Sequence, residues 1–143
     1  MTSKYGLGFQ SVDREFADRE LAVDGSIPSW LRGSLFRNGP AKFEVGDDTV
    51  AHWFDGLGML TRFTFADGTV RYSNRFLRSE EYATVMESGR MAGSQFGTNR
   101  SGLLGAIRDL VVPKQTDNAN VNVLRLGDRF VAITETPVGI EFD

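Results

Sequence analysis

Residues 58–78 read GMLTRFTFADGTVRYSNRFLR, and this stretch decides the fold class. An Asp-Gly pair, Asp67-Gly68, stands between two runs rich in aromatic and other apolar residues. Such a pair is typical of a tight β-hairpin turn, because it tolerates the backbone conformation that the turn needs. The stretch therefore predicts two antiparallel strands. Their apolar positions are Leu60, Phe63 and Phe65 before the turn, and Val70, Tyr72 and Phe76 after it.

A second hairpin is predicted over residues 124–134, where Gly127-Asp128 separates two further apolar runs. A short strand is predicted over residues 33–37. Several short strands with turn residues between them favour an all-β sandwich, barrel or propeller over a fold of alternating strands and helices. Two hairpins make an incomplete sheet with unpaired edges, so we expect a remainder that completes it.

Two local signals interrupt the strands. Ser79 can cap a short helix that starts at Glu80, and Gly89 suits the left-handed position that ends a helix. Before the first strands, Pro28 and Trp30 indicate a fixed corner, in which we expect the tryptophan to cover apolar surface. The fold prediction is thus all-β with short helical insertions.

Composition limits the function. The chain has 143 residues, a net charge of −3 and no cysteine. This length predicts one folding unit over residues 1–143, and the interspersed charges argue against nucleic-acid binding. The absence of cysteine excludes disulfides and thiolate metal sites. With no secretory signal near the N-terminus and no long apolar run, we expect a cytoplasmic protein.

A metal site within the chain is not expected, because His52 is its only histidine. A mixed site of His52 with Asp47, Asp48 or Asp55 would still lack the second histidine of the two-histidine, one-carboxylate sites that hold non-haem iron. The favoured interpretation is a histidine packed beside Trp53.

Glu135 is the carboxylate most suggestive of function. It follows an apolar strand and lies between Thr134 and Thr136. A carboxylate at a strand end needs a partner, which could be a backbone amide, an arginine or an imidazole. Only an imidazole partner would give Glu135 a functional role. The sequence around Glu135 does not show which of the three partners it has.

An amphipathic segment spans residues 102–113, with apolar residues at helical spacing. It could be a core helix or an exposed element that dips into a bilayer surface. Its apolar positions are Leu103, Leu104, Ile107, Leu110 and Val111.

The chain resembles the carotenoid cleavage oxygenases. Residues 25–40, GSIPSWLRGSLFRNGP, are similar to the opening signature of that family, and further matching blocks follow in the family's order and approximate spacing. These blocks are HWFDG with ML (52–60), NRFLR (74–78), FGT (96–98), TDNANVNV (116–123) and TET (134–136).

This resemblance implies a seven-bladed β-propeller, of which the chain is the N-terminal part. It also implies an Fe(II) held by four histidines, and cleavage of a conjugated double bond by O2 into aldehydes or ketones. Glu135 looks like a glutamate that hydrogen-bonds a liganding histidine and fixes its ring. Phe96 and Thr134 look like walls of an apolar substrate tunnel, and residues 103–112 like a membrane-facing segment.

All four liganding histidines of the family lie beyond the TET block, and His52 matches a histidine that is not a ligand. The resemblance therefore implies the N-terminal fragment of a dioxygenase that cleaves a carotenoid, apocarotenoid or stilbene-like substrate. We expect this fragment to bind no metal and to be inactive alone. The alternative is a non-catalytic module that binds an apolar polyene or a membrane surface.

Overall fold

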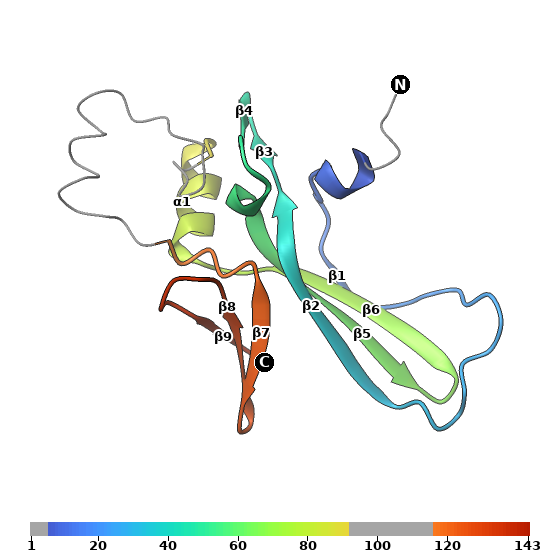
Figure 1. Cartoon of the computed structure of the whole chain (residues 1–143). Coiled ribbons are helices and arrows are strands. Elements are labelled where there is room, and N and C mark those ends of the chain that lie inside the picture. Colours follow the sequence, from blue (N-terminus) through green and yellow to red (C-terminus); the bar gives the residue numbers. More distant parts are fainter. Residues whose placement is uncertain (1–5, 92–115) are drawn as a thin grey trace, which may run out of the picture.

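The computed structural model describes residues 6–91 and 116–143, and strands dominate this part of the chain. Figure 1 shows a long sheet beside a smaller one, with helix α1 next to the smaller sheet. The all-β prediction is confirmed. In chain order the elements are η1 (Gly6–Phe9), β1 (Phe16–Glu20), β2 (Gly33–Lys42), β3 (Glu44–Val45), β4 (Asp48–Thr49), η2 (Trp53–Asp55), β5 (Leu57–Ala66), β6 (Thr69–Phe76), α1 (Glu80–Ser88), β7 (Asn122–Leu126), β8 (Arg129–Ile133) and β9 (Ile140–Phe142).

Strands β5 and β6 form the predicted hairpin. They pair antiparallel from Met59 opposite Phe76 to Ala66 opposite Thr69, which leaves a two-residue turn. Asp67 and Gly68 both have positive φ, at 50° and 78°. Two consecutive positive φ angles match the right-handed twist of the flanking strands, which explains the Asp-Gly pair.

The first sheet is antiparallel and has the strand order β1-β6-β5-β2. Strand β2 continues to Lys42, whereas the sequence predicted its end at Arg37. Pro40 did not suggest a strand, because proline cannot donate a ladder hydrogen bond. The pairing tolerates it because β2 lies at the edge of this sheet and its register shifts between Pro40 and Lys42.

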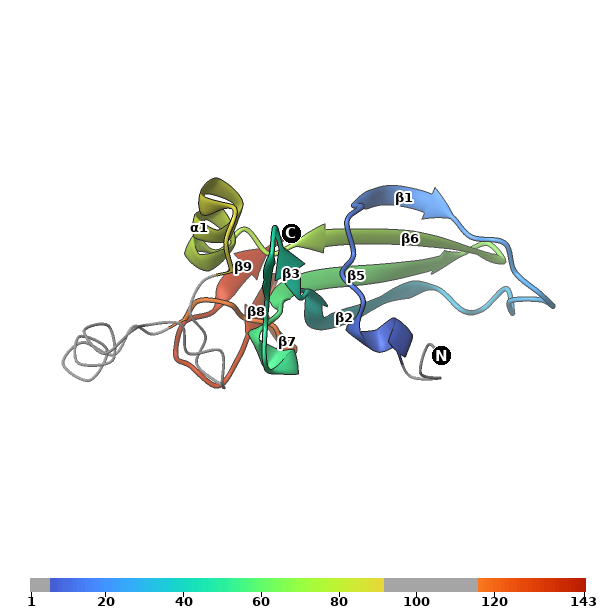
Figure 2. The same cartoon turned by 90° about the horizontal axis from the view of Figure 1, so that it is seen from above.

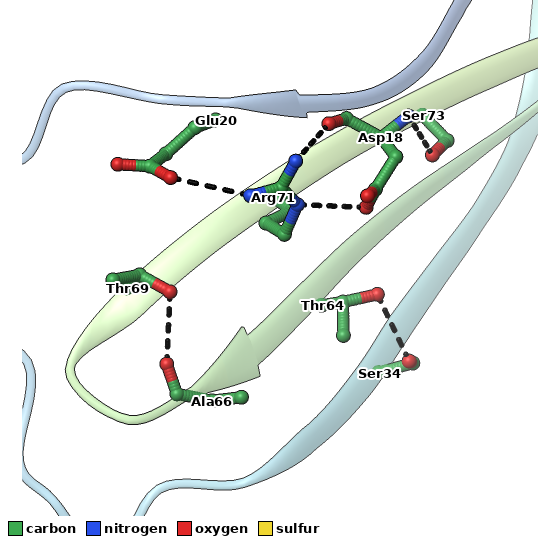
Figure 3. Close-up of polar contacts among 8 residues, drawn as sticks. All are labelled: Asp18, Glu20, Ser34, Thr64, Ala66, Thr69, Arg71 and Ser73. Carbon is green, nitrogen blue, oxygen red and sulfur yellow. Dashed lines mark hydrogen bonds and ion pairs between the residues drawn. The ribbon is translucent and has the colours of Figure 1, made fainter.

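Strand β1 is held at the other edge by an ion-pair group around Arg71 (Figure 3). The Arg71 guanidinium lies 2.9 Å from the Asp18 carboxylate and 3.2 Å from that of Glu20, and it donates to the Asp18 carbonyl at 2.7 Å. The hydrogen bond to the Asp18 side chain is the main cause that raises the pKa of Arg71. These exposed pairs add little stability, but they fix a strand that is bent at Asp18, where φ is 58°.

Helix α1 begins and ends as predicted. The Ser79 hydroxyl accepts a hydrogen bond from the amide of Tyr82, and Gly89 has the left-handed φ of 64°. Val85 is fully buried and belongs to a core cluster with Leu57 and Met59. The helix is therefore packed against the start of β5 in the first sheet.

The second sheet has the order β7-β8-β9 and contains the second predicted hairpin. Gly127 supplies the positive φ of its turn, at 65°. Seen from above in Figure 2, this sheet lies at the α1 end of the first sheet, away from the Asp67-Gly68 turn. The ring centroid of Phe36 lies 5.1 Å from that of Phe130 and 5.8 Å from that of Phe142. These ring contacts pack β2 against the second sheet.

Two buried asparagines join the sheets more specifically. Asn118 accepts from the Gly58 amide at 2.8 Å and donates to the Gly56 carbonyl at 2.9 Å. Asn120 donates to the carbonyls of Gly56, at 2.9 Å, and Phe54, at 2.8 Å. We call Asn118 and Asn120 the asparagine clamp. The clamp supplies hydrogen-bond partners for the Gly58 amide and for the carbonyls of Phe54 and Gly56. These side-chain hydrogen bonds take the place of strand-to-strand hydrogen bonds where the two sheets meet.

One detail of the prediction was wrong. Residues 28–31 do form a corner, in which the Leu31 amide donates to the Pro28 carbonyl at 3.0 Å. Trp30, however, is 78% exposed, so most of its surface is left uncovered by the described residues. A tryptophan next to a proline marks a turn, but the sequence does not show which surface the ring meets.

Replacing Asn118 by Ala should loosen the joint between the sheets. A buried amide or carbonyl left without its partner costs about 1–3 kcal/mol, so hydrogen exchange of the Gly58 amide should accelerate roughly 5- to 150-fold in the full chain. Asn122→Ala is the matched control, because its exposed side chain bonds only its own neighbour, Val123, within the described residues. Equal exchange of Gly58 in both variants would contradict the role of the clamp.

Gly56→Ala should also destabilise the chain, for a steric reason. The added Cβ would lie 2.7 Å from the Phe43 ring and 2.9 Å from Pro40 Cβ, which forces buried groups to move. Overpacking of this kind costs about 1–3 kcal/mol and should lower the melting temperature by several degrees. Gly39→Ala meets no heavy atom within 4 Å and should melt like the unmodified chain. A melting temperature of Gly56→Ala equal to that of this control would refute the close packing.

Candidate functional site

Glu135 lies just after β8, in the connection that leads to β9. The side chain is exposed, and within the described residues its carboxylate makes no hydrogen bond or ion pair. Of the three partners that the sequence left open, none therefore comes from this part of the chain. The carboxylate keeps its acceptor oxygens free for a donor supplied from elsewhere.

The backbone that follows Glu135 is held at two points. The Thr136 hydroxyl donates to the Thr116 carbonyl at 3.0 Å. Further along, Gly139 lies against Val131, so closely that a Cβ there would come within 2.6 Å of the valine side chain. Thr134, the expected tunnel residue, is half-buried at the end of β8. The Glu135 carboxylate, which has no polar partner in this part of the chain, is thus carried by a connection with two fixed points.

Residues 116–118 tie this region to α1. Both oxygens of the Asp117 carboxylate accept amide hydrogens from the first turn of the helix, from Glu80 at 2.5 Å and Glu81 at 3.1 Å. The Thr116 hydroxyl donates to the Glu81 carboxylate. A negative charge at a helix N-terminus interacts favourably with the helix dipole, so Asp117 holds α1 in place electrostatically as well as geometrically.

These anchoring residues were missed as functional positions. The TDNANVNV block was noticed as a family signature, but no role was assigned to Asp117, Asn118 or Asn120. A cluster of small polar residues before an apolar strand was the available signal. It could not reveal partners that lie 36 to 66 residues away in the sequence.

His52 serves as a cap. Its Nδ1 accepts a hydrogen bond from the Phe54 amide at 3.3 Å, at the start of η2. The centroid of its ring lies 5.7 Å from that of Phe54, whose ring also contacts Trp53. No cluster of three or more metal-binding side chains occurs within residues 6–91 and 116–143. With one imidazole in the chain, these residues do not fit a site of four histidines.

The expected substrate and membrane residues lie mostly outside the described residues. This holds for Phe96 and for the apolar positions Leu103, Leu104, Ile107, Leu110 and Val111. Among the helices that the structure describes, none is long and apolar enough to cross a membrane.

A cavity of about 380 Å³ opens between β2 and β7. Phe36 and Phe130 contribute aromatic surface to it, whereas Arg37, Asn38 and Arg125 make it polar. This mixed lining differs from the apolar tunnel that the resemblance implies, so the cavity is not assigned to that tunnel.

Known proteins match this chain over most of its length. The family model described as retinal pigment epithelial membrane protein matches residues 9–143. Human β,β-carotene 15,15′-dioxygenase is 40% identical over 122 residues, which cover 80% of this chain and 22% of that enzyme. The chain thus spans about a fifth of the length of the curated relatives it matches.

Solved structures agree with these relatives. Cobalt-substituted Synechocystis apocarotenoid oxygenase (ACO) matches 95% of this chain and 28% of that protein, with a TM-score of 0.85 and 36% identity. An ACO/RPE65 chimera matches 90% of the chain and 27% of that protein, with a TM-score of 0.77 and 39% identity. ACO is a seven-bladed β-propeller, and the two sheets correspond to an N-terminal part of it, as predicted. The chain therefore belongs to the retinal pigment epithelial membrane protein family, which includes the carotenoid oxygenases.

Proposed function

We propose that this chain is the N-terminal part of a non-haem Fe(II) dioxygenase that cleaves a double bond of a carotenoid or apocarotenoid. The observation that carries the proposal is Glu135, a carboxylate with no polar partner among the described residues, on an anchored connection in a chain that belongs to this family. The named relatives support the substrate class, because one is a β,β-carotene dioxygenase and another an apocarotenoid oxygenase.

The metal would be held by histidines that this chain does not contain. When bound, Fe(II) would activate O2, whose two oxygen atoms end in the two carbonyl products of the cleaved double bond. The metal of one solved relative was exchanged for cobalt, which supports a resident metal in the family. The chain's own residues would contribute orientation rather than ligands.

Glu135 would accept a hydrogen bond from the imidazole N–H of a liganding histidine. Such a bond fixes the ring orientation and raises the basicity of the nitrogen that binds the metal. The carboxylate suits this role because it follows a strand, has no competing partner within the described residues, and is exposed. Thr134 beside it, and Phe96, would line the path of the apolar substrate.

Membrane contact forms a second part of the proposal. Leu103, Leu104, Ile107, Leu110 and Val111 have the spacing of an amphipathic helix, which can take up oily substrates from a bilayer surface. Peripheral attachment of a cytoplasmic protein would suffice for this.

The test is a chimera in which this chain replaces the matching segment of human β,β-carotene 15,15′-dioxygenase. The solved ACO/RPE65 chimera supports the design, because it shows that parts of two family members can be joined in one protein. We expect the purified chimera, loaded with Fe(II), to consume β,β-carotene and form aldehyde products, as followed by chromatography. A folded, metal-loaded chimera that binds the polyene without cleaving it would favour the non-catalytic alternative.

Within this chimera, Glu135→Gln should lower both kcat and retained iron by about 10–100-fold, as substitutions behind metal ligands do. Glutamine keeps the size of the side chain but accepts a hydrogen bond without the negative charge. Glu87→Gln is the matched control, an exposed glutamate on α1. Equal activity and iron content in the two variants would refute the role of Glu135.

A further inference from the structure

We propose that Thr136 is a positioning residue for Glu135, and that it acts by tying the Glu135 backbone to the N-terminus of α1 through residues 116–118. This inference rests on the proposed function, because it concerns how the chain places the carboxylate assigned there. All the contacts that form this tie lie within residues 6–91 and 116–143.

The first link is the hydrogen bond from the Thr136 hydroxyl to the Thr116 carbonyl, at 3.0 Å. Thr136 is half-buried, whereas its neighbour Glu135 is exposed. Because the Glu135 side chain has no contact of its own that could hold it within the described part of the chain, its position depends on the backbone that Thr136 fixes.

The second link runs from Thr116 to the helix. The Thr116 hydroxyl donates to the Glu81 carboxylate and accepts from the Asn118 amide at 3.0 Å. Thr116 therefore contacts the strand connection with its carbonyl and the helix with its side chain. Asp117 adds its two bonds to the amides of Glu80 and Glu81.

The third link makes the chain of contacts rigid. Val85 of α1 is fully buried in the cluster that contains Leu57 and Met59, and Asn118 is bound to the backbone of Gly58 next to them. The path from Glu135 thus ends in the core within a few contacts. Hydrogen-bonded supports of this kind keep a functional side chain within the narrow range that its chemistry needs.

This arrangement separates two roles of Thr136. If its hydroxyl only held the connection in the folded chain, its removal would lower stability and leave turnover per folded molecule unchanged. If the hydroxyl positions Glu135, its removal lowers turnover in molecules that remain folded, with little change in KM, because substrate contacts persist.

The experiment uses the chimera described above with four variants. Thr136→Val removes the hydroxyl at constant size, Thr136→Ser restores it, and Thr116→Val breaks the next link. Thr84→Val is the matched control, since that hydroxyl also bonds a backbone carbonyl, that of Glu80, but lies outside the path. We expect kcat to fall about tenfold for Thr136→Val and Thr116→Val, with KM changed less than twofold, and to recover in Thr136→Ser.

A second readout needs neither metal nor activity. In the full 143-residue chain, amide hydrogen exchange at Glu135 and Thr136 should accelerate about three- to tenfold in Thr136→Val and stay unchanged in Thr136→Ser and Thr84→Val. If a variant chimera does not fold, this measurement still tests the first link, because unchanged exchange at Glu135 and Thr136 in Thr136→Val would overturn the positioning role.

The outcomes separate the two claims. Normal kcat and normal amide exchange in Thr136→Val, in a chimera where Glu135→Gln is impaired, would overturn the positioning role and leave the proposed function intact. Unimpaired activity of the Glu135→Gln chimera would overturn the role of Glu135 and, with it, the positioning role of Thr136, because Thr136 would then have no functional carboxylate to position.

Discussion

The asparagine clamp is the interaction on which the rest of the structure depends. Asn118 and Asn120 bind the backbone of residues 54–58, where the chain passes from η2 into β5. Unpaired, these buried groups would each cost free energy comparable to a lost hydrogen bond. The clamp therefore binds the first sheet at the start of β5 and positions the second sheet, in which Glu135 lies on the connection from β8 to β9. Gly58 permits this approach, because a Cβ there would lie 3.1 Å from that of Asn120.

Local signals in the sequence were enough to predict the hairpins and the helix. Asp67-Gly68 and Gly127 supply the backbone conformations of their turns, and Ser79 and Gly89 supply the two caps of α1. These features depend on residues a few positions apart, so a single sequence reveals them. The clamp could not be predicted in the same way, because Asn118 and Gly58 meet across 60 positions and small polar residues also occur in ordinary turns.

The candidate site was predictable to a similar degree. The position of Glu135 at the end of an apolar strand was visible in the sequence, and the structure places it there. The partner of the Glu135 carboxylate could not be predicted, because the described residues supply none. Family membership is shown, whereas the activity of the whole protein is a proposal, since the chain spans about a fifth of its curated relatives. Phe96 and the apolar residues at 103–111 stay predictions.

In the proposed enzyme, the anchored connection after β8 presents Glu135 to a histidine that holds the metal. A crystal structure of the metal-loaded chimera measures this most directly, through the distance from the Glu135 carboxylate to the nearest imidazole nitrogen. We predict a hydrogen bond of about 2.7–3.2 Å from the N–H of a metal-bound histidine. A Glu135 carboxylate left in solvent, or paired with an arginine or a backbone amide, would contradict it.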